Sequence, residues 1–421
     1  MTAALLSLNR RTFASLRHRN YRLFFSGQVV SVTGTWMQRV AQAWLVFQLT
    51  HSPVAVGILA LAQFLPFSIF GLFAGVLVDR VDARRAVIAT QATAMALASL
   101  IAALALSGVV QAWQVYLVAF LMGTVQVIDA PARQALTYRM VGPTELPNAV
   151  ALNSSLFNAA RIFGPALGGI LIATVGAGPC FAINAASFLA VLAGLLKMRA
   201  DELRPVEQHG ERSTMLQGLR EGFRYVLHTP RALIILLLVS VVSMAAVNNN
   251  VLLPVLAKRT LHSGAETFGL LSSSFGAGAL VGALVAAALS RSSLKLLLVG
   301  TAGYGLSLLV LAPERTLAAA LVLLFVGGTC FTLWTANANS LLQLEAPEHL
   351  RGRVVGLFYF GFAGTGALGG VIAGALAAAG GTTLAFVVAG VVTILATVAA
   401  TLALRDQSRV RFLPEPMRTG P

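Results

Sequence analysis

The sequence is poor in charged residues and almost without cysteine. Only 11% of its 421 residues are charged, whereas 57% are hydrophobic, a balance that a water-soluble fold could not hide. The two cysteines, Cys180 and Cys330, fall within apolar runs and offer no disulfide framework. The six histidines fall in predicted loops or at the ends of apolar runs, away from any cluster of metal ligands. We therefore expect an integral membrane protein that is not an enzyme, with no metal and no cofactor.

Long apolar runs recur along the whole chain. Crossing the hydrocarbon core of a bilayer takes about 20 helical residues, which matches the length of these runs. The alternating pattern of a β-barrel is absent from the sequence, so helices must satisfy the backbone in lipid. The first run is too long and too poorly flanked to be a cleavable signal peptide. The twelve predicted spans are 21–48, 54–78, 86–107, 111–130, 148–176, 179–198, 232–256, 266–290, 294–312, 317–340, 353–379 and 382–404.

The net charge of +15 is distributed very unevenly between the two faces of the predicted membrane protein. With both termini inside, 25 of the 30 Lys and Arg residues fall in cytoplasmic segments or at the cytoplasmic ends of spans. Lys258, Arg259 and Arg315 fall outside, and Arg39 and Arg161 fall within spans. This asymmetry follows the positive-inside rule and favours contact with anionic lipids rather than nucleic acid. We expect a multi-pass protein of the bacterial cytoplasmic (inner) membrane with both termini in the cytoplasm.

The predicted spans form two sets of six. One long hydrophilic segment separates the sets. A repeated sequence pattern indicates a duplication: PTELPNAV precedes ALGG in the first half, and PEHLRGRV precedes ALGG in the second. Repeated halves around a site at mid-membrane are typical of secondary transporters. The predicted parts are a six-helix bundle at 1–198, a cytoplasmic linker with a surface helix at 199–230, a second six-helix bundle at 231–404 and a cytoplasmic tail at 405–421.

Two motifs resemble those of a known transporter superfamily. GVLVDRVDARR, after the second span, resembles the loop signature of the major facilitator superfamily, although Asp82 replaces its second glycine and Ala83 one basic residue. GPALGG in the fifth span resembles the helix motif of that superfamily's drug/proton antiporters, with Ala160 in place of a further glycine. The matching residues are Gly75, Asp79, Arg80, Arg84 and Arg85 in the loop, and Gly164, Pro165, Gly168 and Gly169 in the helix.

Further local resemblances occur at LRHRNYRLFFSGQ, APARQAL, LREGFRYVLHTPR and HLRGRVVGL. Together these segments are similar to the bacterial exporter branch that includes siderophore exporters and multidrug pumps. The resemblance implies an all-α integral membrane protein with twelve transmembrane helices in two pseudo-symmetric six-helix bundles, the major facilitator fold. It also implies that the first, fourth, seventh and tenth helices line a central cavity.

The fifth-span motif predicts a bend and a close helix contact. Pro165 has no N–H, so the carbonyl of Arg161 loses its helical partner and the helix should bend. Small residues at a spacing of four allow a neighbouring backbone to approach. The expected pairings are Gly164 and Gly168 with the eighth-span stripe Ser274, Gly278, Gly282 and Ala286, and Gly71 and Gly75 with Gly366, Gly370 and Gly374 of the eleventh span. In the family these two helix pairs form the seam between the halves.

Charged residues at the cytoplasmic side suggest a gate. The resemblance implies that the loop holding Asp79 and Arg80 latches this side and releases it when the transporter opens inward; the alternative is that Arg80, Arg84 and Arg85 only set topology. Asp129 is the one carboxylate near a span interior, which makes it a candidate proton carrier. Its position close to the cytoplasmic side favours a role in a charge network over proton carriage.

A polar stripe on the first span points to a substrate cavity. Such a helix face must turn toward protein or water, although interhelical hydrogen bonding is an alternative reason for polar residues in spans. The predicted cavity residues are Gln28, Thr35, Gln38, Arg39, Gln42, Gln126, Asn158, Arg161, Asn248, Asn249 and Asn337. Trp36, Phe331 and Trp334 are candidates for an apolar wall.

Arg161 stands out because it falls near the middle of its span. An unpaired arginine there would cost at least about 2.5–3.5 kcal/mol, so it must face a cavity or a partner. With Arg39 it would attract an anionic or carbonyl-rich substrate; the alternative is a structural role at the bend, where it would bind backbone carbonyls.

These observations predict an exporter of small amphipathic organic molecules, such as a drug, a siderophore or a lipid-like metabolite. It would work by alternating access as a monomer, with protons as the coupling ion. Two alternatives stay open: an importer or lysolipid flippase on the same fold, and a non-transporting membrane sensor or partner protein.

Overall fold

The computed structural model describes residues 13–78, 81–204, 215–289 and 292–410, and within these ranges the regular secondary structure is entirely helical. Asp79 and Arg80 of the predicted latch lie outside the described residues. The principal helices are α2 (Arg19–Thr50), α3 (Pro53–Val78), α4 (Ala83–Leu106), α5 (Ala112–Val175), α6 (Ala177–Leu196), α7 (Met215–His228), α8 (Pro230–Ala246), α9 (Asn249–Val255), α10 (Ala265–Leu289), α11 (Leu294–Leu311), α12 (Leu317–Glu345), α13 (Arg351–Tyr359) and α14 (Thr365–Val410). Short π-helical segments follow α9 and α13.

Two of these helices each hold two predicted spans. α5 leaves helical geometry at Gly142 (φ 73°), and α14 does so at Gly380 and Gly381 (φ 70° at Gly381). Within the described ranges, nine helical stretches are long and apolar enough to cross a membrane, with α5 and the α13–α14 stretch counted once each and the more polar α2 left out. Length and composition identify nine such stretches in the described residues, so the twelve membrane crossings stay a prediction.

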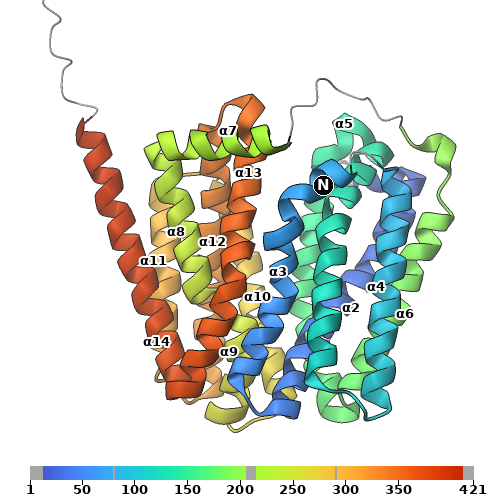
Figure 1. Ribbon diagram of the computed structural model, residues 1–421, viewed down its shortest axis with the longest axis horizontal. Coiled ribbons are helices and arrows are strands. Elements are labelled where there is room, and N and C mark those ends of the chain that lie inside the picture. The colour runs from blue at the N-terminus through green and yellow to red at the C-terminus, as the bar shows by residue number, and fades with distance from the viewer. Residues whose placement is uncertain (1–12, 79–80, 205–214, 290–291, 411–421) are drawn as a thin grey trace, which may run out of the picture.

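Figure 1 shows the helices in two groups that lie side by side: α2 to α6 in blue to green, and α8 to α14 in yellow-green to red. α7 lies across the ends of α8 and α13, with which it is in contact. We call this end, where α2 also begins, the terminal end. The loops after α2 and α9 lie at the opposite end. The main contacts between the groups are α5 with α10 and α3 with α14, which confirms the predicted pairing of the fifth with the eighth span and of the second with the eleventh.

The contact between α5 and α10 is a backbone-to-backbone approach. A Cβ placed on Gly169 would lie 2.7 Å from the carbonyl oxygen of Ala265, and one on Gly276 would lie 2.7 Å from the carbonyl oxygen of Arg161. Gly276 thus covers the carbonyl that Pro165 leaves without a helical partner. One turn away, the hydroxyl of Ser273 donates to the carbonyl of Ile162 at 2.7 Å. α10 therefore covers the backbone of α5 at the point where Pro165 removes a helical hydrogen bond; the predicted bend at this point stays a prediction.

The contact between α3 and α14 is equally close. A Cβ on Gly57 would lie 2.5 Å from the carbonyl oxygen of Gly370, and one on Gly374 would lie 2.6 Å from that of Pro53. Farther along α3, the hydroxyl of Ser68 donates at 3.3 Å to the carbonyl of Gly364, which ends the π-helical segment just before α14.

The predicted pairing was right, but several of the predicted glycine faces were wrong. Gly164 and Gly168 approach Trp36 and Met37 of α2, and it is Gly169 that meets α10. A Cβ added at Gly71 would meet no atom of the described residues within 4 Å. In α10, the residues that face α12 instead of α5 are Ser274, Gly278 and Gly282. Small residues occupy more than one face of these helices, and a spacing of four identifies a face without identifying what it meets.

We expect Gly169→Ala to lower the midpoint of thermal unfolding. The added methyl would overlap backbone atoms of α10, and overpacking of this kind costs about 1–3 kcal/mol. The measurement is the fraction of detergent-solubilised protein that elutes as a single species after heating.

The matched control is Gly71→Ala, where a methyl meets nothing within 4 Å. It should leave the midpoint unchanged or raise it, because alanine favours a helix over glycine by about 1 kcal/mol. Equal losses in both variants would contradict the close approach at Gly169.

Candidate functional site

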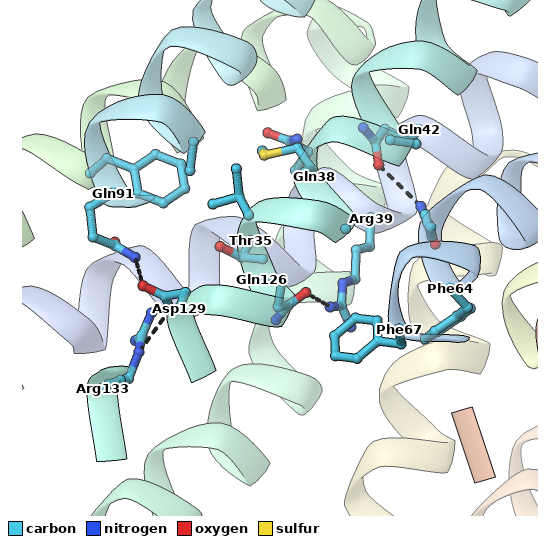
Figure 2. Close-up of a pocket in the computed structure, with 17 residues that line it drawn as sticks. Thr35, Gln38, Arg39, Gln42, Phe64, Phe67, Gln91, Gln126, Asp129 and Arg133 are labelled. Carbon is cyan, nitrogen blue, oxygen red and sulfur yellow. Dashed lines mark hydrogen bonds and ion pairs between the residues drawn. The ribbon is translucent and has the colours of Figure 1, made fainter. Parts of the chain in front are cut away.

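A cavity lies among helices α2 to α6, in the first group, and contains about 740 Å³ of empty space, including space open to solvent. Figure 2 shows polar and aromatic side chains that line it. Five of the predicted cavity residues do so: Thr35, Gln38, Arg39, Gln42 and Gln126. Asp129, predicted as part of a charge network, lines the same cavity. The structure therefore brings the polar face of the first span and the fourth span together.

The other predicted cavity residues lie elsewhere. The amides of Asn158, Asn248 and Asn337 each donate to the carbonyl four residues earlier in their own chain, at 2.8–3.0 Å. Asn337 also accepts from the backbone N–H of Ser293 at 3.1 Å. The residues that do not line this cavity are Gln28, Asn158, Arg161, Asn248, Asn249 and Asn337. Their part in a substrate path stays a prediction.

Asp129 is buried, with 6% of its surface exposed, and its carboxylate accepts hydrogen bonds from three side chains. Thr90 and Gln91 of α4 donate to one oxygen at 2.7 and 2.9 Å. Arg133, one turn along α5, donates to the other oxygen through two nitrogens and forms an ion pair with it. Arg133 also donates to the side-chain oxygen of Gln28 in α2. The result is a polar network that joins α2, α4 and α5, as Figure 2 shows in part.

Arg39 occupies another part of the cavity wall. Its guanidinium donates to the side-chain oxygen of Gln126 at 2.9 Å and lies 4.9 Å from the ring centre of Trp36. Beside it, Gln63 donates to Gln42 at 3.2 Å. Among the described residues Arg39 has no carboxylate partner, so this cation is stabilised by an amide dipole and an aromatic face and its charge is not neutralised.

In the described part of the loop signature, charged side chains form hydrogen bonds that cap the ends of α6 and α4. Arg84 donates through Nε and Nη2 to the carbonyl of Leu195, at 3.0 and 2.8 Å, and so caps the C-terminus of α6. Asp82, which stands where the motif has a glycine, is the N-cap of α4: it accepts from the backbone N–H of Arg85 at 3.0 Å and pairs with Arg139 at 2.7 Å. Gly75 lies in α3.

The charge on Asp82 is stabilised by these partners. Partial burial alone would raise the pKa of its carboxyl, but the hydrogen bond from Arg139 and those from backbone N–H groups lower the pKa below its usual value. The contribution of the ionised form to stability is therefore fully present above the ordinary pKa of an aspartate and is lost as the pH falls through the lowered value.

Several lining residues were not predicted from the sequence. Gln63 and Gln91 are isolated polar residues in apolar spans, a signal that could have identified them. Arg133 lies one turn after Asp129, a spacing at which opposite charges pair on a helix. The aromatic residues Phe64, Phe67 and Phe188 carry no such signal, because phenylalanine is common throughout membrane helices.

We expect Asp129→Asn to lower the free energy of unfolding by about 2 kcal/mol, because Arg133 would lose its counter-ion in a partly buried place. Arg133→Gln should cost a similar amount. The double variant should cost less than the two single changes together, since the charges then disappear as a pair.

Thermal unfolding of the four proteins in detergent measures this coupling, and Thr93→Val, which alters an exposed hydroxyl on α4, is the control. Strict additivity would show that the ion pair contributes nothing to stability.

At Asp82, two variants separate its roles. Asp82→Asn keeps an N-cap and removes the ion pair, whereas Asp82→Ala removes both, and loss of an N-cap costs about 1 kcal/mol. At neutral pH we expect the order of thermal stability to be parent, Asn variant, Ala variant. Below a pH of about 4 the difference between the parent and the Asn variant should begin to shrink, and it should vanish once the pH has fallen below the lowered pKa of Asp82. A constant gap across pH would exclude the ionised form as the cause.

Comparison with known proteins agrees with the helical architecture. Among solved structures, a mutant of the nucleoside transporter NupG has a TM-score of 0.75 at 13% identity, over 91% of this chain and 99% of that one. A bacterial homolog of the human lysosomal transporter Spinster has a TM-score of 0.73 at 12% identity, over 94% and 99% of the two chains. At such low identity these similarities establish the fold alone, which is that of the major facilitator transporters.

Sequence comparison is more specific. The chain is 29% identical over 356 residues to the multidrug efflux pump Tap of Mycolicibacterium fortuitum (82% of this chain and 85% of that one). It is 27% identical over 367 residues to the enterobactin exporter EntS of Citrobacter koseri (85% of each) and 21% identical over 340 residues to the staphyloferrin A transporter of Staphylococcus aureus (80% and 84%). A family model described as transmembrane secretion effector matches residues 10–412. The chain belongs to this family of multi-pass major facilitator transporters, which move small molecules and are not enzymes.

Proposed function

We propose that the protein is a secondary active exporter of the bacterial cytoplasmic membrane that moves small amphipathic organic molecules out of the cell. Its relatives named as an efflux pump and a siderophore exporter support this direction of transport. We further propose that the two helix groups are the two six-helix bundles at 1–198 and 231–404, joined by the linker that contains α7.

The cavity in the first group carries this proposal. It sets the aromatic rings of Phe64, Phe67 and Phe188, which belong to apolar helices, beside the polar groups of Gln38 and Arg39 of α2. A cavity with both kinds of lining suits a molecule that has an apolar body and a polar end.

The contacts between the two groups support alternating access. At the opposite end, Arg259 donates to the carbonyl of His51 at 2.6 Å, and Trp44 stacks on Phe268 at 6.2 Å between ring centres. The close approach of Gly374 to Pro53 lies at the same end. The distribution of Lys and Arg assigns the terminal end to the cytoplasm, so these contacts would close the protein toward the outside. Rocking of the bundles across the glycine contacts would then open it there.

Protons are the proposed coupling ion, and the network around Asp129 is the proposed conformational switch. The carboxylate is held by Thr90, Gln91 and Arg133 in this state, so any change in the charge of its surroundings alters the contact of α4 with α5. This supports a role in gating over one in carrying protons. The protein would act as a monomer in contact with anionic lipids.

The test is efflux of fluorescent amphipathic dyes from bacteria that express the protein, with and without a protonophore. We expect efflux that the protonophore abolishes. Asp129→Asn should slow it several-fold at matched abundance in the membrane, because the network loses its only carboxylate. Arg315→Gln, which removes a charge from an exposed loop residue, is the control. Dye that accumulates inside the cells, or efflux that survives the protonophore, would contradict the proposed mode of transport.

A further inference from the structure

Arg161 is a cation within a predicted span that the described part of the structure leaves without a hydrogen-bond acceptor or an acidic partner. Its guanidinium lies instead against three aromatic rings, 5.0 Å from the ring centre of Phe275, 5.3 Å from that of Phe331 and 5.9 Å from that of Trp36. The rings come from α10, α12 and α2. Segments far apart in the sequence thus meet around one positive charge.

Aromatic faces attract an arginine but leave most of its hydrogen-bonding capacity unused. A guanidinium carries five N–H donors in one plane, arranged to bind two oxygens of one anion at once. A ring face offers electrostatic attraction to the cation and no oxygen lone pair. Away from bulk water such donors are costly to leave unpaired. Arg161 is therefore prepared to bind an acceptor that the described residues do not supply.

Arg39 brings a second positive charge to the same ring. Its guanidinium carbon lies 4.9 Å from the ring centre of Trp36, so Trp36 contacts both cations. Among the described residues neither arginine forms an ion pair; the buried carboxylate of Asp129 is engaged by Arg133. The region around Trp36 thus has an excess of positive charge.

The remaining wall of this region is aromatic. Phe275 and Phe331 are 5.4 Å apart between ring centres, and Tyr304 lies 5.7 Å from Phe331. Flat rings at these distances offer faces and edges against which another planar ring can pack. We define the cationic–aromatic site by Trp36, Arg39, Arg161, Phe275 and Phe331.

We propose that the cationic–aromatic site binds the substrate through an oxyanion on an aromatic ring, so that the transported molecules are aromatic acids. This inference rests on the proposed transport function and names the class of substrate that the protein would transport. The oxyanion would accept from the free N–H groups of Arg161, and the ring would pack beside Phe275 and Phe331. Arg39 would add long-range attraction. Because both helix groups contribute residues, the bound molecule would contact both.

The first experiment compares probes of one shape and different charge. Full-length purified protein in detergent is titrated with tritiated 2-naphthoate in a scintillation proximity assay. Competitors are 2-naphthamide, which is neutral, 2-naphthylmethylammonium, which is cationic, and cyclohexanecarboxylate, which is an anion without an aromatic ring. We expect 2-naphthamide and 2-naphthylmethylammonium to bind at least about tenfold more weakly than 2-naphthoate, the effect of losing one charge-assisted hydrogen bond. Cyclohexanecarboxylate should also bind more weakly, because it keeps the anion and loses the packing of an aromatic ring. Equal binding of the amide and the acid would overturn the proposal.

The second experiment tests whether Arg161 causes the preference for the anionic probe. Arg161→Gln should weaken the binding of 2-naphthoate about tenfold to a hundredfold and leave the binding of 2-naphthamide nearly unchanged. Arg161→Lys should restore part of the preference for the anion, because it keeps the charge and loses the planar fork. Arg315→Gln should bind like the parent protein. If Arg161→Gln bound the anion as tightly as the parent does, the site would be assigned wrongly.

The outcomes separate this inference from the function on which it rests. A change in Arg161 that weakened all probes equally would show a structural role at the bend and overturn the inference. If Arg161→Gln does not fold, the Arg39→Gln variant and the comparison of probes on the parent protein still test the inference. Dye efflux without a preference for 2-naphthoate would agree with the proposed exporter and contradict the proposed anionic substrate. Selective binding of 2-naphthoate without efflux would leave the site and contradict the exporter.

Discussion

The rest of the structure depends on the backbone contact between α5 and α10. Neither helix could approach so closely with side chains at Gly169 and Gly276, since an added Cβ at either position would lie 2.7 Å from a carbonyl oxygen of the other helix. The contact lets α10 cover the carbonyl that Pro165 frees, so α5 can hold a proline without an exposed polar group. It also sets the distance between the two helix groups, and with it the position of every residue that lies between them.

A second constraint is that polar groups in a membrane must find partners within the protein, and this chain meets it unevenly. The carboxylate of Asp129 is fully engaged by neighbours from α4 and α5. Arg39 has one amide acceptor and one ring face, and Arg161 has ring faces alone within the described structure. Polar groups that are completely satisfied stabilise one arrangement, whereas unsatisfied donors favour binding. These three charges therefore divide into one that is fully engaged and two that keep unused donors, which we propose face the ligand.

The sequence predicted the helices and their pairing well, because apolar length and glycine spacing are local properties. It predicted five lining residues of the cavity from one polar helix face. It could not tell that Gly164 faces α2 while Gly169 faces α10, since that depends on how α5 turns after its bend. Trp36 and Phe331 were predicted as an apolar wall, but their position around Arg161 depends on contacts between helices of different groups. Tertiary packing of this kind leaves no periodic signal in one chain.

The seam and the cationic–aromatic site share a residue, and this joins binding to movement. The carbonyl of Arg161 lies under Gly276, while its side chain lies against Phe275, the preceding residue of α10. An anion on the guanidinium would therefore act within one residue of the contact across which the helix groups would move in the proposed transport cycle. A ligand shifts a conformational equilibrium only by its difference in affinity for the two states. A site built from both groups has such a difference by construction, because separation of α10 from α5 removes Phe275 from Arg161 and exposes the cation to water. A substrate bound at the proposed site would thus hold the two groups together.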